Sequence, residues 1–189
     1  MKYHSALRDE LENQKEITHY TIKDSLAFYH DVIHNFGLPK EYNKCDILYA
    51  EPSWSGGITK FDKRANTSTT YNEYVASLNN IIKTTTIPIV LIVGIKDSKK
   101  LRTPFERHIT KIHGAKAFAN IYNWSYKGPL DDTYTIIENL SNQFDCVGDF
   151  CCGYGNTGEI FFKKNKNFIM SDYNKKCIGY IKENIGEDI

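Results

Sequence analysis

The chain has 189 residues, of which 41% are hydrophobic and 25% charged, a composition typical of a globular protein with a substantial core. Its formal net charge of +1 excludes nucleic-acid binding through overall charge, so any such contact must come from a local basic patch. No apolar run reaches the roughly 18 residues of a membrane span, and residues 1–4 do not open a signal peptide. We therefore expect a single domain over residues 1–189, in the cytoplasm and without contact to a membrane.

Five cysteines are present, an odd number without any Cys-x-x-Cys pair. They are Cys45, Cys146, Cys151, Cys152 and Cys177. Disulfide frameworks normally use an even set, and zinc sites commonly use cysteines paired at short spacing. The sequence therefore predicts buried free thiols and no metal site.

Short apolar segments alternate with segments of helical periodicity along the chain. In the first half the expected order is a strand over 17–22 that ends at Asp24, a helix over 25–36, a strand over 46–50, a mobile loop over 56–70, a helix over 71–82 and a strand over 88–94. In the second half it is a strand over 117–126, a helix over 133–140, a strand over 144–150, a helix over 157–164, a strand over 168–171 and a helix over 175–184. This alternation predicts an α/β fold with a mainly parallel sheet and helices on both faces.

Residues 96–116 form a basic tract between the two halves. They contain seven Lys and Arg residues and two His residues against only two acidic residues. Such a tract can follow the phosphates of a nucleic acid, and the alternative is a solvated loop and helix face. The residues expected to contact nucleic acid are Lys99, Lys100, Arg102, Arg107 and Lys111.

The sequence FDCVGDFCCGYGNTG has the pattern of a cofactor-binding loop. Asp149 ends the predicted strand over 144–150, and three glycines follow it in a tight turn before a helix. Glycines let the backbone approach a ligand closely, and Asp172, at the end of the next strand, suits the hydroxyl pair of a ribose. The alternative is an ordinary strand–helix connection in which Asp172 caps the last helix.

The tetrapeptide Glu51-Pro52-Ser53-Trp54 directly follows the predicted strand over 46–50. In an α/β sheet, ligands bind beyond the carboxyl ends of the strands, so these residues are expected at the working edge. A carboxylate beside an aromatic face can accept hydrogen bonds from an exocyclic amino group while a flat ring stacks on the aromatic side chain. A turn with a buried tryptophan is the alternative.

Taken together, the two motifs resemble those of a known enzyme family. CDILYAEPSWSGG is similar to the D-x-x-x-x-D-P-P-[Y/W] motif of amino methyltransferases, and DFCCGYGNTG is similar to their cofactor loop, D-P-F-C-G-S-G-T-T-G. The catalytic motif precedes the cofactor loop, and this circularly permuted order resembles that of β-class S-adenosylmethionine-dependent DNA methyltransferases. The resemblance covers nearly the whole chain and implies a Rossmann-like methyltransferase fold.

The resemblance implies a role for each matching residue. S-adenosylmethionine is expected to bind at Asp24, Asp149, Phe150, Cys151, Cys152, Gly153, Gly155 and Asp172. Of these, Asp172 is expected at the ribose hydroxyls and Asp24 near the adenine. Catalysis is expected at Glu51, Pro52, Ser53 and Trp54, by direct transfer of a methyl group to adenine N6, or to cytosine N4 as the second choice, without a metal or a covalent intermediate. The tract 96–116 takes the place of a target-recognition region, and its short length suggests a homodimer or a partner subunit.

Three residues depart from the family pattern. Glu51 replaces Asp or Asn, Ser53 replaces a second proline, and Tyr154 replaces a small residue of the cofactor loop. Because Glu51 and Ser53 lie in the catalytic motif, an inactive nucleic-acid-binding subunit with the same fold stays an alternative. The pattern also resembles that of RNA adenosine methyltransferases, so RNA is the alternative to DNA as the substrate, and a small-molecule methyltransferase is a third choice.

Overall fold

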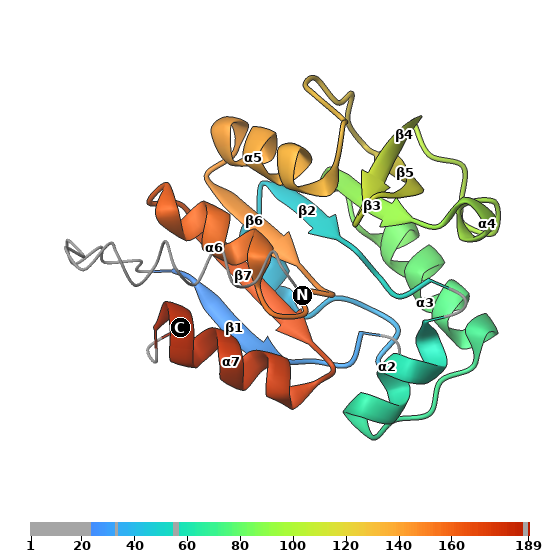
Figure 1. The fold of residues 1–189 in the computed structure, drawn as a ribbon, viewed down its shortest axis with the longest axis horizontal. Helices are drawn as coiled ribbons and strands as arrows, with labels where there is room; N and C mark the ends of the chain where they lie inside the picture. Colours follow the sequence, from blue (N-terminus) through green and yellow to red (C-terminus); the bar gives the residue numbers. More distant parts are fainter. Residues whose placement is uncertain (1–23, 33, 55–56, 187–188) are drawn as a thin grey trace.

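The protein folds around a seven-stranded sheet (Figure 1), and this computed structural model describes residues 24–32, 34–54, 57–186 and 189. The strands are β1 (Leu26–Tyr29), β2 (Ile47–Ala50), β3 (Ile89–Val93), β4 (Glu106–Ile112), β5 (Ala115–Tyr122), β6 (Cys146–Asp149) and β7 (Asn167–Asp172). Their order in the sheet is β1-β7-β6-β2-β3-β5-β4. The first five in this order are parallel to one another, and β5 and β4 add antiparallel pairs at one side. The predicted mainly parallel sheet is therefore confirmed.

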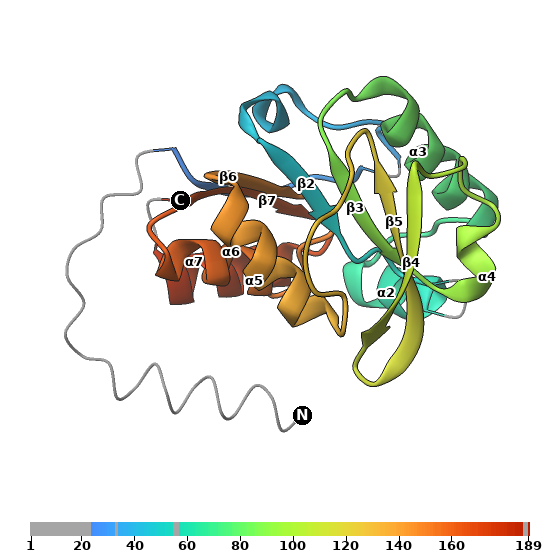
Figure 2. The same ribbon diagram turned by 90° about the horizontal axis from the view of Figure 1, so that it is seen from above.

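Helices cover both faces of the sheet, as the sequence predicted. They are the 3-10 helix η1 (Lys40–Lys44) and the α-helices α2 (Ile58–Ala65), α3 (Tyr71–Thr84), α4 (Ile95–Ser98), α5 (Thr133–Gln143), α6 (Asn156–Lys163) and α7 (Lys175–Ile185). Figure 2 shows α5, α6 and α7 together on one face and α3 on the other. Within the described residues, no helix is long and apolar enough to cross a membrane.

The strand residues alternate between two hydrophobic cores. In β2, Ile47 and Tyr49 join the core under α5, α6 and α7, whereas Leu48 and Ala50 join the core under α3. All four side chains are buried, because a parallel strand in the middle of this sheet is covered on both faces. This double burial explains why DILYA is a continuous apolar run, and it holds the end of β2 firmly in place.

The prediction of a helix over 25–36 is wrong. Residues Leu26–Tyr29 form β1, which pairs in parallel with β7 from Leu26↔Ile169 to Tyr29↔Asp172. Its side chains alternate with a period of two, since Ala27 belongs to one core while Leu26 and Phe28 pack against the other. Hydrogen bonding to β7 therefore overrides the helical spacing of the apolar residues. The strand predicted over 17–22 lies outside the described residues.

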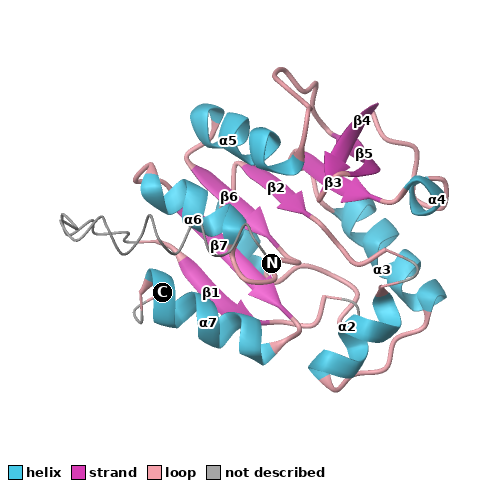
Figure 3. Ribbon diagram, in the orientation of Figure 1, coloured by secondary structure: helices cyan, strands magenta, loops and turns pink. Residues whose placement is uncertain are grey.

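The predicted loop over 56–70 also differs from the structure, because it contains α2 (Figure 3). Asn66 ends this helix in the left-handed conformation, with φ 58°, and the Asp62 carboxylate accepts a hydrogen bond from the Thr69 amide at 2.9 Å. The Thr70–Glu73 capping box then begins α3, as each side chain bonds the other residue's amide. Polar local contacts, which an apolar pattern does not reveal, therefore shape this segment.

The basic tract 96–116 contains most of α4 and the whole of β4. Strand β4 is the edge of the sheet, and Arg107, Ile109 and Lys111 lie on its exposed positions. Part of the tract is therefore a strand of the sheet, rather than the solvated loop and helix face that was the alternative to a binding region.

Candidate functional site

The tetrapeptide Glu51-Pro52-Ser53-Trp54, the glycine loop and Asp172 follow three neighbouring parallel strands of the sheet. Tyr49 in β2 pairs with Asp149 in β6, and Asp149 pairs with Met170 in β7. The tetrapeptide over residues 51–54, the glycine loop and Asp172 consequently leave the sheet at the same edge. The carboxyl edge of a parallel sheet is where ligands bind in α/β proteins.

Asp149 is a buried carboxyl group that organises the glycine loop. It accepts hydrogen bonds from the Cys151 amide at 3.0 Å and from the Thr157 hydroxyl at 2.7 Å. The pKa of Asp149 is raised to about 7, mainly because burial disfavours the charged form; the nearby Glu51 and Asp172 charges add to the rise, and these two hydrogen bonds oppose it. The group therefore titrates near neutral pH and responds to any positive charge placed beside it.

Asp172 holds the other side of the loop. Its carboxylate accepts from the Gly153 amide at 2.9 Å and from the Asn174 amide at 2.8 Å. Burial raises the pKa of Asp172, and these two amides oppose the rise. Asp172 thus joins the glycine loop to the residue that caps α7, Asn174, and its role toward a ligand stays a prediction.

The glycines of the loop differ in what they allow. Gly155 has φ 88°, and a Cβ there would lie 2.7 Å from an Ile181 side-chain carbon, so both conformation and packing require glycine. Gly153 has φ 52°, and no atom lies within 4 Å of where its Cβ would stand. The backbone at Gly153 therefore borders open space, as close approach of a ligand requires.

The side chains around the glycines face different ways. Phe150 and Cys152 are buried in the two cores, so only their backbone atoms are placed to meet a ligand. Cys151 is partly buried, and burial together with the Asp172 and Asp149 charges raises the pKa of its thiol. Tyr154 is exposed and makes an edge-on contact with Tyr180, so it does not crowd the loop. All five cysteines are free thiols, and only Cys151 is less than fully buried, in agreement with the sequence prediction.

Glu51 leaves β2 toward α5 and accepts a hydrogen bond from the Tyr49 hydroxyl. Burial raises the pKa of Glu51, and hydrogen bonds from the Tyr49 and Thr133 hydroxyls oppose the rise. The side chain is partly buried and within electrostatic range of Asp149. The Tyr49 hydroxyl therefore holds one carboxylate oxygen of Glu51 in place, and the carboxylate lies at the carboxyl edge of the sheet.

The rest of the tetrapeptide is fixed by contacts with β3, α3 and β7. Pro52 is buried, and the Ser53 carbonyl accepts a hydrogen bond from the Tyr74 hydroxyl. The Trp54 ring lies against Gly94, where a Cβ would be 3.2 Å from the ring. The Ser53 hydroxyl also bonds the Tyr173 side chain, which follows β7. The tetrapeptide thus touches the segment that carries Asp172.

Glu51, Asp149 and Asp172 form an acidic cluster at this edge. Among the described residues, none of them is ion-paired with a Lys or Arg side chain, and no group of three or more His, Cys, Asp or Glu side chains could hold a metal ion. Partly and fully buried carboxyl groups with raised pKa values are stabilised by a cationic ligand or by hydroxyl donors. The cluster therefore suits an organic cation that carries hydroxyl groups.

The placement predicted for Asp24 is wrong. Asp24 is exposed, precedes β1 at the opposite edge of the sheet, and lies 3.8 Å from the Lys44 ammonium. Because 25–36 contains a strand instead of a helix, the acidic residue beyond the carboxyl end of β1 is Asp31. Asp31 is buried, and its charge helps to raise the pKa of the Cys151 thiol.

The five predicted nucleic-acid residues do not form one cluster. Lys99 and Lys100 follow α4, and the Lys100 ammonium lies 4.3 Å from the centre of the Tyr71 ring. The Arg102 carbonyl accepts a hydrogen bond from the Tyr122 hydroxyl. Tyr122 pairs with the first residue of β3, so this contact lies toward the edge of the sheet opposite to the acidic cluster. Within β4, Arg107 bonds Asn120 at 3.1 Å, and Lys111 is exposed near the carboxyl end of β3. Lys99, Lys100 and Lys111 therefore lie toward the carboxyl end of β3, on the side of the sheet edge that carries the acidic cluster.

Several polar contacts at the site were not predicted from the sequence. The Tyr42 hydroxyl donates to the Asp149 carbonyl at 3.0 Å and lies 2.7 Å from the Ser171 hydroxyl, and Tyr49 and Tyr74 hold the catalytic tetrapeptide. These tyrosines occupy buried positions that look like ordinary core aromatics in the sequence. The one local signal is Tyr49, a phenol within an otherwise aliphatic strand two residues before Glu51.

Comparison with known proteins identifies the fold through structure alone. No protein-family model and no curated protein matches the sequence. The M1.HpyAVI–SAM complex covers 85% of this chain and 98% of its own, with 13% identity and a TM-score of 0.54. TTHA0409 from Thermus thermophilus is a proposed DNA modification methylase, and one of its structures covers 85% of this chain and 94% of its own, with 13% identity and a TM-score of 0.56. Its complex with S-adenosyl-L-methionine covers 87% of this chain and 94% of its own, with 12% identity and a TM-score of 0.56. The predicted Rossmann-like methyltransferase fold is therefore confirmed.

Proposed function

We propose that this protein is an S-adenosylmethionine-dependent methyltransferase that modifies an exocyclic amino group of a DNA base, with adenine N6 as the first choice and cytosine N4 as the second. The observation that carries the proposal is the meeting of Glu51-Pro52-Ser53-Trp54 and the glycine loop on neighbouring strands, around an acidic cluster. The similar structures support it, since two of them contain S-adenosylmethionine and TTHA0409 is a proposed DNA modification methylase. The basic residues nearest this edge support a nucleic-acid substrate.

The residues at the edge fit this cofactor. S-adenosylmethionine supplies a methyl group on a positively charged sulfur, together with an ammonium group and a ribose. The open space beside Gly153 admits a ligand, and the raised pKa values of Asp149 and Asp172 are lowered again when positive charge arrives. Asp172 would accept hydrogen bonds from the ribose hydroxyls. Asp31, rather than Asp24, is the acidic residue placed to face the adenine side.

The catalytic tetrapeptide would hold the target base. Glu51 and the Pro52 carbonyl would accept hydrogen bonds from the amino group, and Trp54 would stack on the base after it leaves the duplex. The nitrogen lone pair would form the new N–C bond while the S–C bond breaks and its electron pair returns to sulfur. The amino group would then lose one proton to water. The contribution of the chain is therefore position and stabilisation of the developing positive charge.

The basic residues would contact the nucleic-acid backbone. Lys99, Lys100 and Lys111 are exposed toward the carboxyl end of β3, whereas the Arg102 carbonyl contacts Tyr122 beside the first residue of that strand. We propose one methyltransferase domain whose short tract 96–116 gives loose sequence selection, helped by a second copy or a partner subunit. A filter-binding series on duplex and single-stranded DNA tests the contact, because each lost phosphate contact lowers the salt dependence of binding.

Calorimetric titration with S-adenosylmethionine, followed by transfer of a labelled methyl group to DNA and to RNA, tests the proposal. Asp149→Ala is expected to abolish cofactor binding, because it removes the acceptor of the Cys151 and Thr157 hydrogen bonds as well as a negative charge. Glu51→Ala and Trp54→Ala are expected to keep cofactor binding and to stop transfer. Normal cofactor binding without any transfer to nucleic acid contradicts the enzymatic proposal, and transfer to RNA alone favours the RNA alternative.

One observation favours a second candidate function. The Tyr49 hydroxyl already occupies one oxygen of Glu51, and Ser53 does not give the rigid turn of a second proline. A nucleic-acid-binding subunit that keeps the fold without transferring a methyl group would show these features. Tight binding of DNA or of a partner protein by the wild type, with no turnover and no effect of Glu51→Ala, would support this second function.

A further inference from the structure

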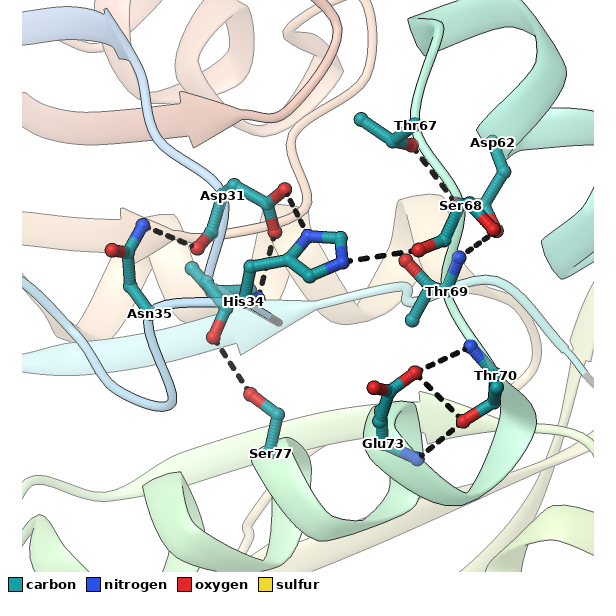
Figure 4. A network of polar contacts seen from close by, with 11 residues as sticks. Asp31, His34, Asn35, Asp62, Thr67, Ser68, Thr69, Thr70, Glu73 and Ser77 are labelled. Carbon is teal, nitrogen blue, oxygen red and sulfur yellow. Dashed lines mark hydrogen bonds and ion pairs between the residues drawn. The ribbon is translucent and has the colours of Figure 1, made fainter.

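His34 joins the loop after β1 to the loop between α2 and α3 (Figure 4). Its Nδ1 atom lies 2.6 Å from Asp31 Oδ2, and its backbone amide donates to Asp31 Oδ1 at 3.0 Å. Its Nε2 atom lies 3.1 Å from the carbonyl oxygen of Ser68. One imidazole ring therefore holds a buried carboxylate on one side and a distant loop on the other.

Both contacts of the ring need a proton on histidine. A carbonyl oxygen can only accept, so Nε2 must carry a hydrogen, and the Asp31 carboxylate requires a hydrogen on Nδ1 as well. The arrangement therefore contains the doubly protonated ring. The Asp31 hydrogen bond raises the pKa of His34 most, and the charges of Asp31 and Glu73 and the Ser68 carbonyl add to this rise against partial burial.

The loop that His34 holds depends on few contacts. Thr67 and Thr69 both donate to Asp62 of α2, at 3.1 Å and 2.9 Å, and Thr70 begins the capping box of α3. Ser68 is exposed and reaches the rest of the protein through its carbonyl bond to His34. Loops held by exposed polar contacts open at low cost, so loss of one bond changes their order measurably.

Asp31 connects this junction to the proposed cofactor site. The neighbouring His30 amide donates to the Asp172 carbonyl at 3.1 Å, so the loop after β1 runs beside Asp172. The Asp31 charge also reaches the Cys151 thiol in the glycine loop. The charged groups facing His34 are Asp31 from its own loop and Glu73 from α3, while Asp62 of α2 anchors the loop that His34 contacts.

We propose that His34 is a positioning residue that, when doubly protonated, holds Asp31 at the cofactor site and ties residues 66–70 to the loop after β1. The effect on the cofactor depends on the proposed function, whereas the effect on the loop does not. Because the folded pKa of His34 is raised, its stabilising contribution is complete below its ordinary value of 6.5 and disappears as the pH rises through the raised value. Loop order is therefore expected to fall as the pH increases, and the contribution of His34 to cofactor affinity falls with it, against the gain that deprotonation of Asp149 and Asp172 brings.

The test compares the wild type with His34→Gln and the control His108→Gln. His108 also bonds a carboxylate, Glu106, at 2.8 Å, but it lies on the edge strand β4. Amide-exchange protection of Thr67 and Thr69, corrected for intrinsic exchange, is measured by NMR between about pH 5.5 and 8.5, and the His34 ring is titrated in the same samples. Calorimetry with S-adenosylmethionine at the same pH values gives the cofactor affinity.

In the wild type and in His108→Gln, protection is expected to fall by about threefold to tenfold as the pH rises, the loss of one hydrogen bond. Their cofactor affinity should exceed that of His34→Gln by a similar factor at low pH and approach it at high pH, because all three proteins share the pH dependence of Asp149 and Asp172. In His34→Gln protection should be low and independent of pH. A His34 ring that titrates at or below its ordinary value, or protection that His34→Gln leaves unchanged, overturns the proposal. If the wild type binds no cofactor at any pH, the proposed function fails, and the exchange data still decide whether His34 holds the loop.

Discussion

Substituting Gly94 by alanine tests whether tight packing positions Trp54. Gly94 follows β3 and precedes α4, with φ −60° and ψ 151°, which alanine adopts freely, so only space decides the outcome. A Cβ there would lie 2.7 Å from Asp97 Oδ2 and 3.2 Å from the Trp54 ring. Asp97 is buried and accepts from the Tyr71 hydroxyl at 2.5 Å, so it is poorly able to move aside. Part of the crowding should therefore fall on Trp54.

The magnitude follows from two opposing terms. Overpacking a well-filled site costs about 1–3 kcal/mol, while replacing glycine by alanine recovers about 0.4–1 kcal/mol by restricting the unfolded chain. We expect Gly94→Ala to lower the free energy of unfolding by about 1–2 kcal/mol, which lowers the melting temperature by about 2–4 °C per kcal/mol. Displacement of the Trp54 ring by a fraction of an ångström should reduce methyl transfer about tenfold, with unchanged cofactor affinity.

Denaturant unfolding, calorimetry with S-adenosylmethionine and labelled methyl transfer check this prediction. Gly179→Ala is the matched control, because Gly179 lies inside α7 with open space around its Cβ position. This control should stabilise the protein by about 0.5–1 kcal/mol and keep the activity. If Gly94→Ala unfolds and transfers methyl groups like the wild type, the inference that Gly94 and Asp97 position Trp54 is refuted.

Three further changes probe the site and its support. Asp149→Asn should flatten the fall in unfolding free energy between about pH 4 and 7. The pKa of Asp149 is raised, so the stabilising contribution of its protonated form is lost as the pH rises through this range. Denaturant unfolding at each pH measures this slope, and an unchanged slope would contradict burial of the carboxyl group. Thr70→Ala removes the cap of α3 and should cost about 1 kcal/mol in thermal or chemical unfolding, and no loss would exclude a stabilising capping box. Lys111→Gln should weaken DNA binding equally across sequences and reduce the salt dependence by about one phosphate contact in filter binding, and an unchanged salt slope would remove Lys111 from the DNA surface.

The two motifs were recognisable in the sequence because their signals are local. The apolar run before Glu51 predicts a buried strand, and the glycines after Asp149 predict a tight turn into a helix. Parallel strands end at a common edge, so this information was enough to expect both motifs close together. The structure confirms the strands at both motifs and the shared edge.

The start of the chain shows where local patterns fail. The apolar residues of 25–36 have helical spacing, yet Leu26–Tyr29 pairs with β7. Because this segment is a strand, the acidic residue beyond its carboxyl end is Asp31, and Asp24 lies at the other end of the strand. Helix α2 was missed because the polar contacts of Asp62 and the left-handed Asn66 that fix its end do not show as a periodic pattern in the sequence. In both cases the deciding hydrogen bonds join residues whose partners a periodicity does not reveal.

The sequence by itself determined most of the alternation of strands and helices, the Glu51–Trp54 motif and the glycine loop. These depend on neighbouring residues, whose spacing and backbone freedom are written along the chain. Only the tertiary structure decided which acidic residue lies at the carboxyl edge of β1. It also decided that the Tyr49 hydroxyl donates a hydrogen bond to Glu51 and that His34 joins two loops. Those features arise from hydrogen bonds and burial between segments far apart in the chain, whose energies depend on the folded arrangement.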